Sequence, residues 1–206
     1  MDTLSRFLRG DIPGVCVEPD GRVLVQSMPP VALLPGSFNP IHAGHWRLTE
    51  VASRLVAGPV GFEMSVINVD KPPLLEAEVR NRMEQFAGRA RLWLTRAPTF
   101  AEKAVLFPGV RFIIGADTAA RLVAPRYYGG SGSRMAEALD GIRRRGCRFL
   151  VAGRIDENGR FVELEHVAIP DHYRDLFAAI PSEEFRVDLS STQLRSGAVA
   201  KAPAEG

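Results

Sequence analysis

Two histidines three residues apart, His42 and His45, are the side chains of this sequence best placed to do chemistry. They end the string GSFNPIHAGH, which follows a short apolar run at 31–35 and precedes a helical pattern at 46–55. A turn from a strand into a helix brings backbone N–H groups and a helix N-terminus together, where they bind anions. We therefore expect a phosphate-binding site at residues 36–45, with a turn holding a structural histidine as the alternative.

A second string, DLSSTQLR at 188–195, has the residue types of a helix start that binds phosphate. Ser190 or Ser191 is a good N-cap, and the hydroxyl groups of Ser191 and Thr192 suit phosphate oxygens. Arg195 adds a fixed positive charge one turn later. An ordinary capped helix explains the same residues, so this string alone leaves both interpretations open.

A third string, FIIGADT at 112–118, reads as a central strand that runs into a helix. Asp117 stands at the start of that helix. Its carboxylate could accept hydrogen bonds from ribose hydroxyls, or it could cap its own helix. Spacing alone does not separate these two roles.

Together these strings resemble the HxGH-motif nucleotidyltransferases, which share a fold with the catalytic domain of class I aminoacyl-tRNA synthetases. The wider form G-S-F-N-P-x-H-x-G-H is similar to that of nicotinamide and nicotinate mononucleotide adenylyltransferases, and SSTQLR resembles their I-S-S-T-x-(I/L)-R signature. The resemblance implies transfer of AMP from ATP to a mononucleotide, with release of pyrophosphate and formation of a dinucleotide. Such a transfer needs aligned anions and stabilised charge rather than a nucleophile of the enzyme.

The resemblance implies roles for residues in and between the three strings. His45 is expected to contact the transferred phosphate, with His42 assisting at the other phosphates and Arg195 holding the departing pyrophosphate. The ATP-binding residues it implies are Gly36, Ser37, Phe38, His42, His45, Gly115, Asp117, Ser191, Thr192 and Arg195. The mononucleotide-binding residues it implies are Ser37, Phe38, Lys71, Trp93, Thr99 and Phe100. A surface position for Lys71, and core positions for Trp93 and Phe100, are the alternatives.

The resemblance also implies Mg²⁺, bridging ATP oxygens mostly through ligand and water contacts. No cluster of Asp and Glu in the sequence indicates a metal site built by the protein. The expected partners are therefore small molecules, ATP and a mononucleotide.

Other activities of the same fold compete with this hypothesis. A cytidylyltransferase usually has a G-T-F-D opening and an R-T-x-G-I-S-T-T ending, and neither occurs here. A phosphopantetheine adenylyltransferase stays open. A class I aminoacyl-tRNA synthetase is disfavoured because the sequence has no KMSKS-like string. A catalytically silent nucleotide-binding sensor is disfavoured because both histidines of the motif and Arg195 are present.

Strands and helices alternate from residue 31 onward, which predicts an α/β fold. We expect a Rossmann-like doubly wound parallel sheet of about five or six strands, with right-handed crossovers and helices on both faces. The expected strands are 31–34, 62–69, 91–94, 111–115 and 147–152, with 185–187 as a last strand. The expected helices are 44–57, 76–87, 99–106, a short one from about 117, and 135–145. The HxGH turn follows the first of these strands, where ligands bind in open parallel sheets.

The composition is that of a soluble globular protein, with 206 residues, 46% hydrophobic and 24% charged. We expect a hairpin appendage over 1–30, a nucleotidyltransferase domain over 31–197 and a flexible tail over 198–206. Cys16 and Cys147 have no metal-ligand spacing, so a reduced, cytoplasmic setting is expected. We expect no signal peptide, no membrane span and, with a net charge of +2, no nucleic-acid partner. The oligomeric state stays open, a homo-oligomer included.

Overall fold

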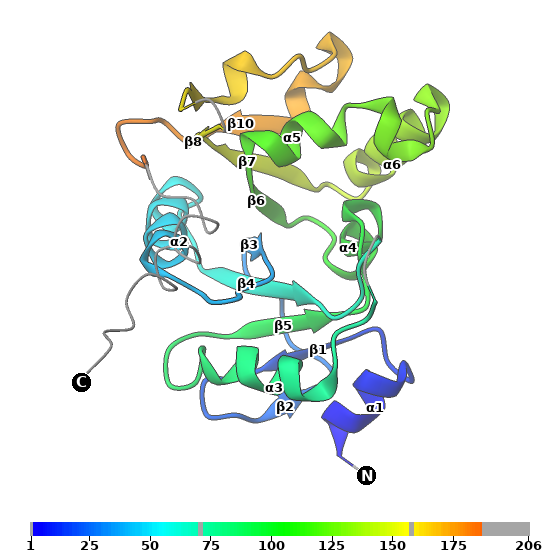
Figure 1. Ribbon diagram of the computed structural model, residues 1–206, viewed down its shortest axis with the longest axis vertical. Coiled ribbons are helices and arrows are strands. Elements are labelled where there is room, and N and C mark those ends of the chain that lie inside the picture. The colour runs from blue at the N-terminus through cyan, green and yellow to red at the C-terminus, as the bar shows by residue number, and fades with distance from the viewer. Residues whose placement is uncertain (1, 70–71, 157–158, 187–206) are drawn as a thin grey trace, which may run out of the picture.

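The computed structural model describes residues 2–69, 72–156 and 159–186, and its centre is an eight-stranded sheet (Figure 1). The strand order is β10-β7-β6-β3-β4-β5-β1-β2. The six strands from β10 to β5 are parallel, while β1 and β2 run antiparallel at one edge. This confirms the expected α/β fold with a mostly parallel sheet. The parallel part has six strands, as expected, and the N-terminal hairpin adds two antiparallel strands to the same sheet.

The bounds of the elements stay close to those expected from the sequence. The sheet strands are β1 (Gly14–Val17), β2 (Val23–Leu24), β3 (Ala32–Pro35), β4 (Val60–Ser65), β5 (Leu92–Thr95), β6 (Arg111–Gly115), β7 (Arg148–Ala152) and β10 (Phe177–Ala179). A small separate hairpin is formed by β8 (Arg154–Ile155) and β9 (Phe161–Val162). The α-helices are α1 (Thr3–Arg9), α2 (Ala43–Leu55), α3 (Glu76–Glu84), α4 (Phe100–Leu106), α5 (Ala116–Leu122) and α6 (Gly132–Arg144). The 3₁₀ helices are η1 (Pro125–Tyr128), η2 (Leu164–His166) and η3 (Asp171–Leu176).

The order of the strands reverses between β3 and β6. From β3 the chain builds outward through β4 to β5, and it then returns to β6 and builds the other way through β7 to β10. The pairing of β3 with β6 covers only Ala32 with Arg111 and Leu33 with Phe112. By contrast, β3 stays paired with β4 as far as Pro35. The two halves of the sheet therefore diverge at their carboxyl ends, where ligands bind in folds of this type.

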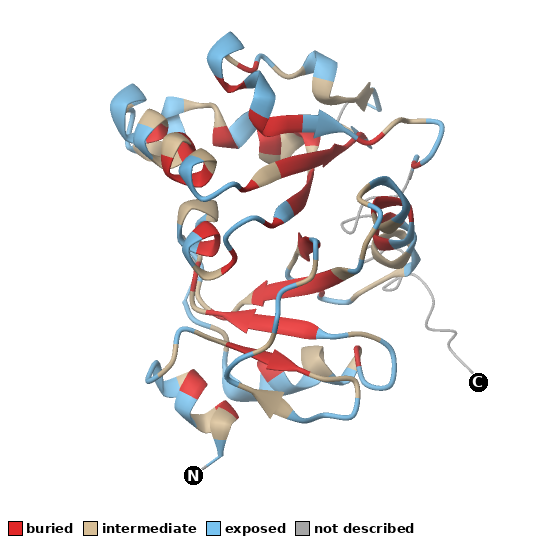
Figure 2. Ribbon diagram, turned by 180° about the vertical axis from the view of Figure 1, so that it is seen from behind, coloured by how far each residue is buried: buried red, intermediate tan, exposed pale blue. Residues whose placement is uncertain are grey.

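Both faces of the sheet are buried, as expected for parallel strands covered by helices (Figure 2). Successive strand residues point to opposite faces, so Leu34 and Leu94 pack with α1, α2 and α3 in one cluster. Leu33 and Trp93 pack with α4, α5, α6 and η3 in the other cluster. None of the helices in the described part of the chain has the length and apolar content needed to cross a membrane.

Two expectations about strands were wrong. Phe185 and Arg186 lie outside the strands, and Val187 lies outside the described residues. Phe185 follows a turn, where its N–H donates to the carbonyl of Pro181 at 3.1 Å, and its side chain is buried in the core cluster that contains Leu34. The sixth parallel strand is instead β10, which pairs with β7. The strand expected to reach residue 69 ends at Ser65.

The N-terminal hairpin is fixed to the sheet rather than attached loosely beside it. Cys16 of β1 lies opposite Trp93 of β5, and Val17 lies opposite Leu92. Cys16 is 2% exposed, so the hairpin also contributes to the core. The division of the chain into an appendage over 1–30 and a domain over 31–197 stays a prediction.

Candidate active site

A cavity of about 600 Å³ opens at the carboxyl ends of β3, β6 and β7, where the two halves of the sheet diverge. The motif turn and α2 form one wall. The start of α5 and the segment from β7 to β8 form the opposite wall, and Phe100 reaches the cavity from α4. Its lining includes Ser37, Phe38, His42, Gly44, His45, Phe100, Gly115, Asp117, Arg121, Gly153 and Arg154.

The turn before α2 is built around the ring of Phe38. That ring is 1% exposed and packs edge-on against Phe62 and Phe86. The backbone of Phe38 has φ 44, a conformation that costs a non-glycine residue about 1–3 kcal/mol. Gly36 makes the packing feasible, because a Cβ at this position would lie 2.6 Å from the Phe38 ring. Burial of the ring therefore holds the turn in a shape that the backbone alone would disfavour.

The two histidines of the motif are held together at the start of α2. The backbone N–H of His42 donates to Nδ1 of His45 at 3.2 Å, and the two ring centroids are 3.8 Å apart. An Nδ1 that accepts a hydrogen bond carries no proton, so neutral His45 has its proton on Nε2. Phe38 packs edge-on against the His45 ring at 5.3 Å. His45 is thereby fixed as a donor through Nε2.

Burial favours the neutral form of both imidazoles. Burial, with a smaller contribution from the neighbouring His42, lowers the pKa of His45 to about 4. Burial also lowers the pKa of His42. His45 is therefore neutral near pH 7 in the ligand-free protein. A bound phosphate would add negative charge beside it and favour protonation.

The N-terminus of α2 adds backbone donors to the same wall. The helix has 13 residues, and Gly44 and His45 in its first turn line the cavity. The N–H of His45 donates to the carbonyl of His42 at 3.0 Å, and the first turn of the helix lies at the positive end of its dipole. This end of α2 therefore suits an anion.

The opposite wall carries an ion pair. Nη1 of Arg154 lies 3.3 Å from Oδ1 of Asp117, and both side chains are about half exposed. Oδ1 of Asp117 also lies 2.8 Å from where a Cβ on Gly115 would be, so a larger residue there would displace the carboxylate. Arg121, one turn further along α5, lines the cavity as well. This wall thus offers two guanidinium groups and one carboxylate.

A family model described as Cytidylyltransferase-like matches residues 33–197, which include both walls of the cavity. The chain belongs to this family of nucleotidyltransferases. A search of curated proteins finds no match to the chain. Family membership indicates a nucleotidyltransferase and leaves the nucleotide and the acceptor open.

Most of the nucleotidyltransferase site residues expected from the sequence come together at this cavity. Ser37, Phe38, His42, His45, Phe100, Gly115 and Asp117 line it, and Gly36 lies within the turn. Lys71, Ser191, Thr192 and Arg195 lie outside the described residues, so their roles stay predictions.

Two expected residues are placed elsewhere. Trp93 is 5% exposed and faces the other core cluster, where it lines a second hollow of about 620 Å³ together with Cys16. Thr99 caps α4: its hydroxyl accepts a hydrogen bond from the N–H of Glu102 and donates one to the Glu102 carboxylate. Neither residue belongs to the lining of the cavity.

Arg121 and Arg154 are functional candidates that the sequence reasoning missed. Arg154 follows the strand at 148–152 after a single glycine, Gly153. Polar residues directly after a parallel strand lie at the edge where ligands bind, so this position carried a usable signal. Arg121 gave no comparable signal, because an arginine in the last turn of a helix is common on any surface.

A buried ion pair fixes α4, and with it Phe100, to the sheet. Nζ of Lys103 lies 2.6 Å and 2.7 Å from the two carboxylate oxygens of Glu63 in β4. The hydroxyl of Thr95 in β5 donates to the same carboxylate at 2.5 Å. The side chains of Lys103 and Glu63 are 6% and 1% exposed. This network ties α4 to two neighbouring strands next to the cavity.

Proposed function

We propose that this chain is an adenylyltransferase that joins AMP from ATP to nicotinamide mononucleotide or nicotinate mononucleotide. The observation that carries the proposal is His45, a neutral imidazole with its proton on Nε2, set at the start of α2 in the lining of the cavity. The motif that holds it, GSFNPIHAGH, is the string that resembles mononucleotide adenylyltransferases.

In the proposed reaction, an oxygen of the acceptor phosphate attacks the α-phosphorus of ATP. The bond from that phosphorus to the bridging oxygen of the β-phosphate breaks, and pyrophosphate leaves with the electron pair. His45 donates from Nε2 to the transferred phosphate, and His42 and the N-terminus of α2 stabilise charge on the neighbouring oxygens. Preorganised donors of this kind supply much of the rate enhancement in such transfers.

We assign the remaining ligand contacts as the sequence resemblance implies. Asp117 would accept hydrogen bonds from the ribose of ATP, and Ser191, Thr192 and Arg195 would hold the departing pyrophosphate. Ser37 and Phe100, which line the cavity, would contact the acceptor mononucleotide, and Lys71 would contact the incoming phosphate. Phe38 would act through its backbone and by supporting His45, since its ring is buried.

Mg²⁺ bound to ATP would neutralise charge on the phosphates and on the leaving group. Among the described lining residues, Asp117 is the one carboxylate, and it is paired with Arg154. The metal would therefore be held by phosphate oxygens and water rather than by a cage of protein ligands.

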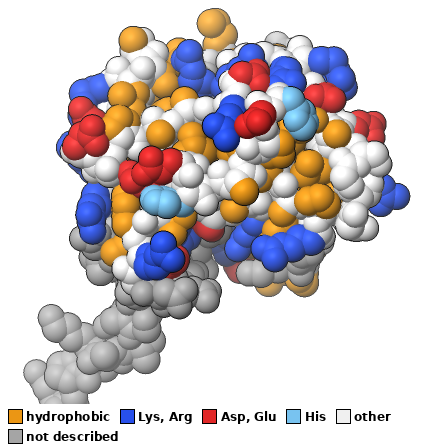
Figure 3. Space-filling model, turned by 90° about the horizontal axis from the view of Figure 1, so that it is seen from above, with side chains coloured by type: hydrophobic (Ala, Val, Ile, Leu, Met, Phe, Trp, Pro, Cys, Tyr) orange, Lys and Arg blue, Asp and Glu red, His pale blue; other side chains and the backbone are white. Residues whose placement is uncertain are grey.

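The surface charge supports small-molecule substrates. On the face shown in Figure 3, Lys and Arg side chains lie among Asp and Glu side chains. A nucleic-acid-binding protein usually gathers its basic residues into a stripe or patch. The net charge of +2 gives no indication of a nucleic-acid partner.

A single panel of assays tests the proposal. The protein is incubated with Mg²⁺, equal ATP and CTP, and one acceptor at a time: nicotinamide mononucleotide, nicotinate mononucleotide, phosphopantetheine or phosphocholine. We expect pyrophosphate release and a dinucleotide whose mass shows AMP transfer. A cytidylyl product, or activity with phosphopantetheine alone, would replace the proposal by the corresponding alternative. Nucleotide binding without any product would favour a silent sensor.

A further inference from the structure

The side-chain amide of Gln85, at the carboxyl end of α3, forms hydrogen bonds with the motif turn. Nε2 of Gln85 donates to the carbonyl of Phe38 at 3.0 Å, and the N–H of Ile41 donates to Oε1 of Gln85 at 2.9 Å. A single residue thus bonds to both ends of the segment between Phe38 and Ile41. Gln85 lies 44 residues beyond Ile41 in the sequence, so this contact is tertiary.

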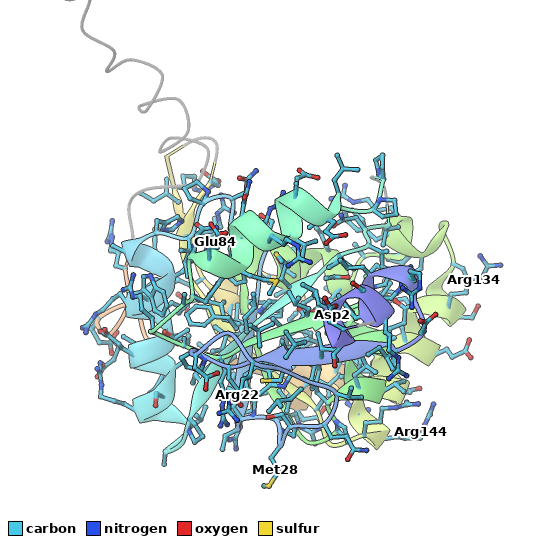
Figure 4. All side chains as sticks on the ribbon, turned by 90° about the horizontal axis from the view of Figure 1, so that it is seen from below. Asp2, Arg22, Met28, Glu84, Arg134 and Arg144 are labelled. Atoms are coloured by element: carbon cyan, nitrogen blue, oxygen red, sulfur yellow. The ribbon has the colours of Figure 1, made fainter. Side chains whose placement is uncertain are left out.

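Two further side chains of the same helix end contact the turn. Nη1 of Arg82 donates to the carbonyl of Ser37 at 3.1 Å. The ring of Phe86 packs edge-on against that of Phe38 at 5.2 Å. Figure 4 shows this end of α3, marked by Glu84, directed toward α2. The helix end and the start of α2 therefore enclose the turn between them.

The segment that Gln85 bonds to leads directly into the two histidines. Ile41 precedes His42, whose N–H donates to Nδ1 of His45. At the other end of the segment, the ring of Phe38 supports the His45 ring. A shift of the turn would consequently change both contacts that orient His45.

An amide is the chemical group that this position needs. It offers a donor and an acceptor a fixed distance apart, and it carries no charge. A carboxylate would accept a hydrogen bond from the N–H of Ile41. It has no proton to donate, however, so it could not bond to the Phe38 carbonyl. Lysine could donate to that carbonyl but could not accept from Ile41.

We propose that Gln85 is a positioning residue for nucleotidyl transfer: it sets the turn at residues 38–41 so that Nε2 of His45 faces the transferred phosphate. Gln85 lies outside the lining of the cavity, so it would act through the turn and not on a ligand. This inference rests on the proposed function, since it needs a transferred phosphate at His45.

Gln85→Met tests the proposal by removing both hydrogen bonds at nearly constant side-chain length. The matched control is Asn81→Leu, which removes an amide from an exposed position one turn earlier on α3. We expect Gln85→Met to lower kcat by about 10- to 100-fold, the range for a misplaced catalytic group. KM values for both substrates should stay within about threefold, because ground-state contacts are retained. Asn81→Leu should behave as the parent protein.

Gln85→Glu gives a second test. It keeps the acceptor for Ile41 but sets a carboxylate oxygen against the carbonyl of Phe38, so its kcat should also fall below that of the parent. Melting temperatures of all variants show whether any loss comes from unfolding. An unchanged kcat in folded Gln85→Met, an equal loss in Asn81→Leu, or a loss confined to KM would each overturn the proposal.

A measurement without turnover separates this inference from the proposed function. In ¹⁵N spectra of the imidazole groups near pH 7, parent His45 should be the tautomer protonated on Nε2. Gln85→Met should shift this tautomer balance, and Asn81→Leu should not. If the parent transfers no nucleotide but the spectra change as expected, the proposed function fails and the positioning of His45 stands. If the parent is active and His45 is unchanged in Gln85→Met, the positioning role fails alone.

Discussion

At the scale of single residues, the contact that matters most is the backbone N–H that fixes His45 as a donor through Nε2. Removing this side chain should lower kcat by about 10²- to 10³-fold, as for other preorganised donors to a charged transition state. His45→Ala is measured by pyrophosphate release, with His172→Ala as the control at an exposed histidine outside the cavity. A folded His45→Ala protein that keeps more than about a tenth of parent turnover would contradict the role, since that lies far outside the range.

The same histidine makes the stability of the ligand-free protein depend on pH. The pKa of His45 is about 4 in the folded state and near 6.5 when the chain unfolds. Below pH 6.5 the unfolded state therefore binds a proton at His45 that the folded state does not bind. The free energy of unfolding consequently falls as the pH approaches 4.

We expect the parent to lose more thermal stability than His45→Gln between pH 6.5 and pH 4, because glutamine cannot take up that proton. Melting curves of both proteins across this range measure the difference. Parallel curves would show that His45 is not buried in its neutral form.

At the scale of elements, the buried pair of Lys103 and Glu63 anchors α4 to β4. Lys103→Met leaves the Glu63 carboxylate buried without its cation. Removing one partner of such a pair lowers the free energy of unfolding by about 3–5 kcal/mol. The double variant Lys103→Met with Glu63→Leu removes both charges and should recover most of that loss. Urea denaturation of the two variants measures the free energies of unfolding; equal losses in both would contradict this account.

The sequence predicted elements whose signals are local. The apolar run at 31–34, the motif turn and the helix after it form a continuous pattern, and their positions agree with β3, the turn and α2. The strand at 111–115 was predicted at its observed bounds for the same reason. By contrast, β10 has three residues, and two of them are exposed alanines. Its sequence therefore shows almost none of the hydrophobic pattern that predicts a strand.

Contacts between distant segments could not be predicted in the same way. Trp93 was expected at the ligand, but its position in β5 directs it to the opposite face from Leu94. Sequence alternation shows that neighbours point apart, but it does not show that β5 lies two strands away from β3, where the two halves of the sheet diverge. The pairing of Arg154 with Asp117 and the contacts of Gln85 join residues 37 or more positions apart, and no local pattern reveals them.

At the scale of the whole molecule, the cavity exists because two halves of one sheet separate at their carboxyl ends. One half carries the motif turn and the histidines, and the other carries Asp117 and Arg154. The two halves meet through the short pairing of β3 with β6 and through α4, which packs against α6. Substrates bound in the cavity would contact both halves at once.

The division of the sheet also coincides with a division of the chain. Strands β1 to β5 and helices α1 to α4 precede Pro108, and β6 and the elements that follow it come after Gly109. Both of these residues are exposed, and the N–H of Gly109 donates to the carbonyl of Arg145, a bond that a new amino terminus could keep.

The protein should therefore fold and keep its activity when it is produced as two complementary fragments. Coexpressed fragments 1–108 and 109–206 should reassemble, because association buries the core cluster that α4 shares with α6. Copurification through a tag on one fragment, followed by the pyrophosphate assay, measures this complementation. Each fragment alone should be inactive, since it holds one wall of the cavity. Fragments that fold but do not associate would show that the continuous chain, and not the shared core, holds the halves together.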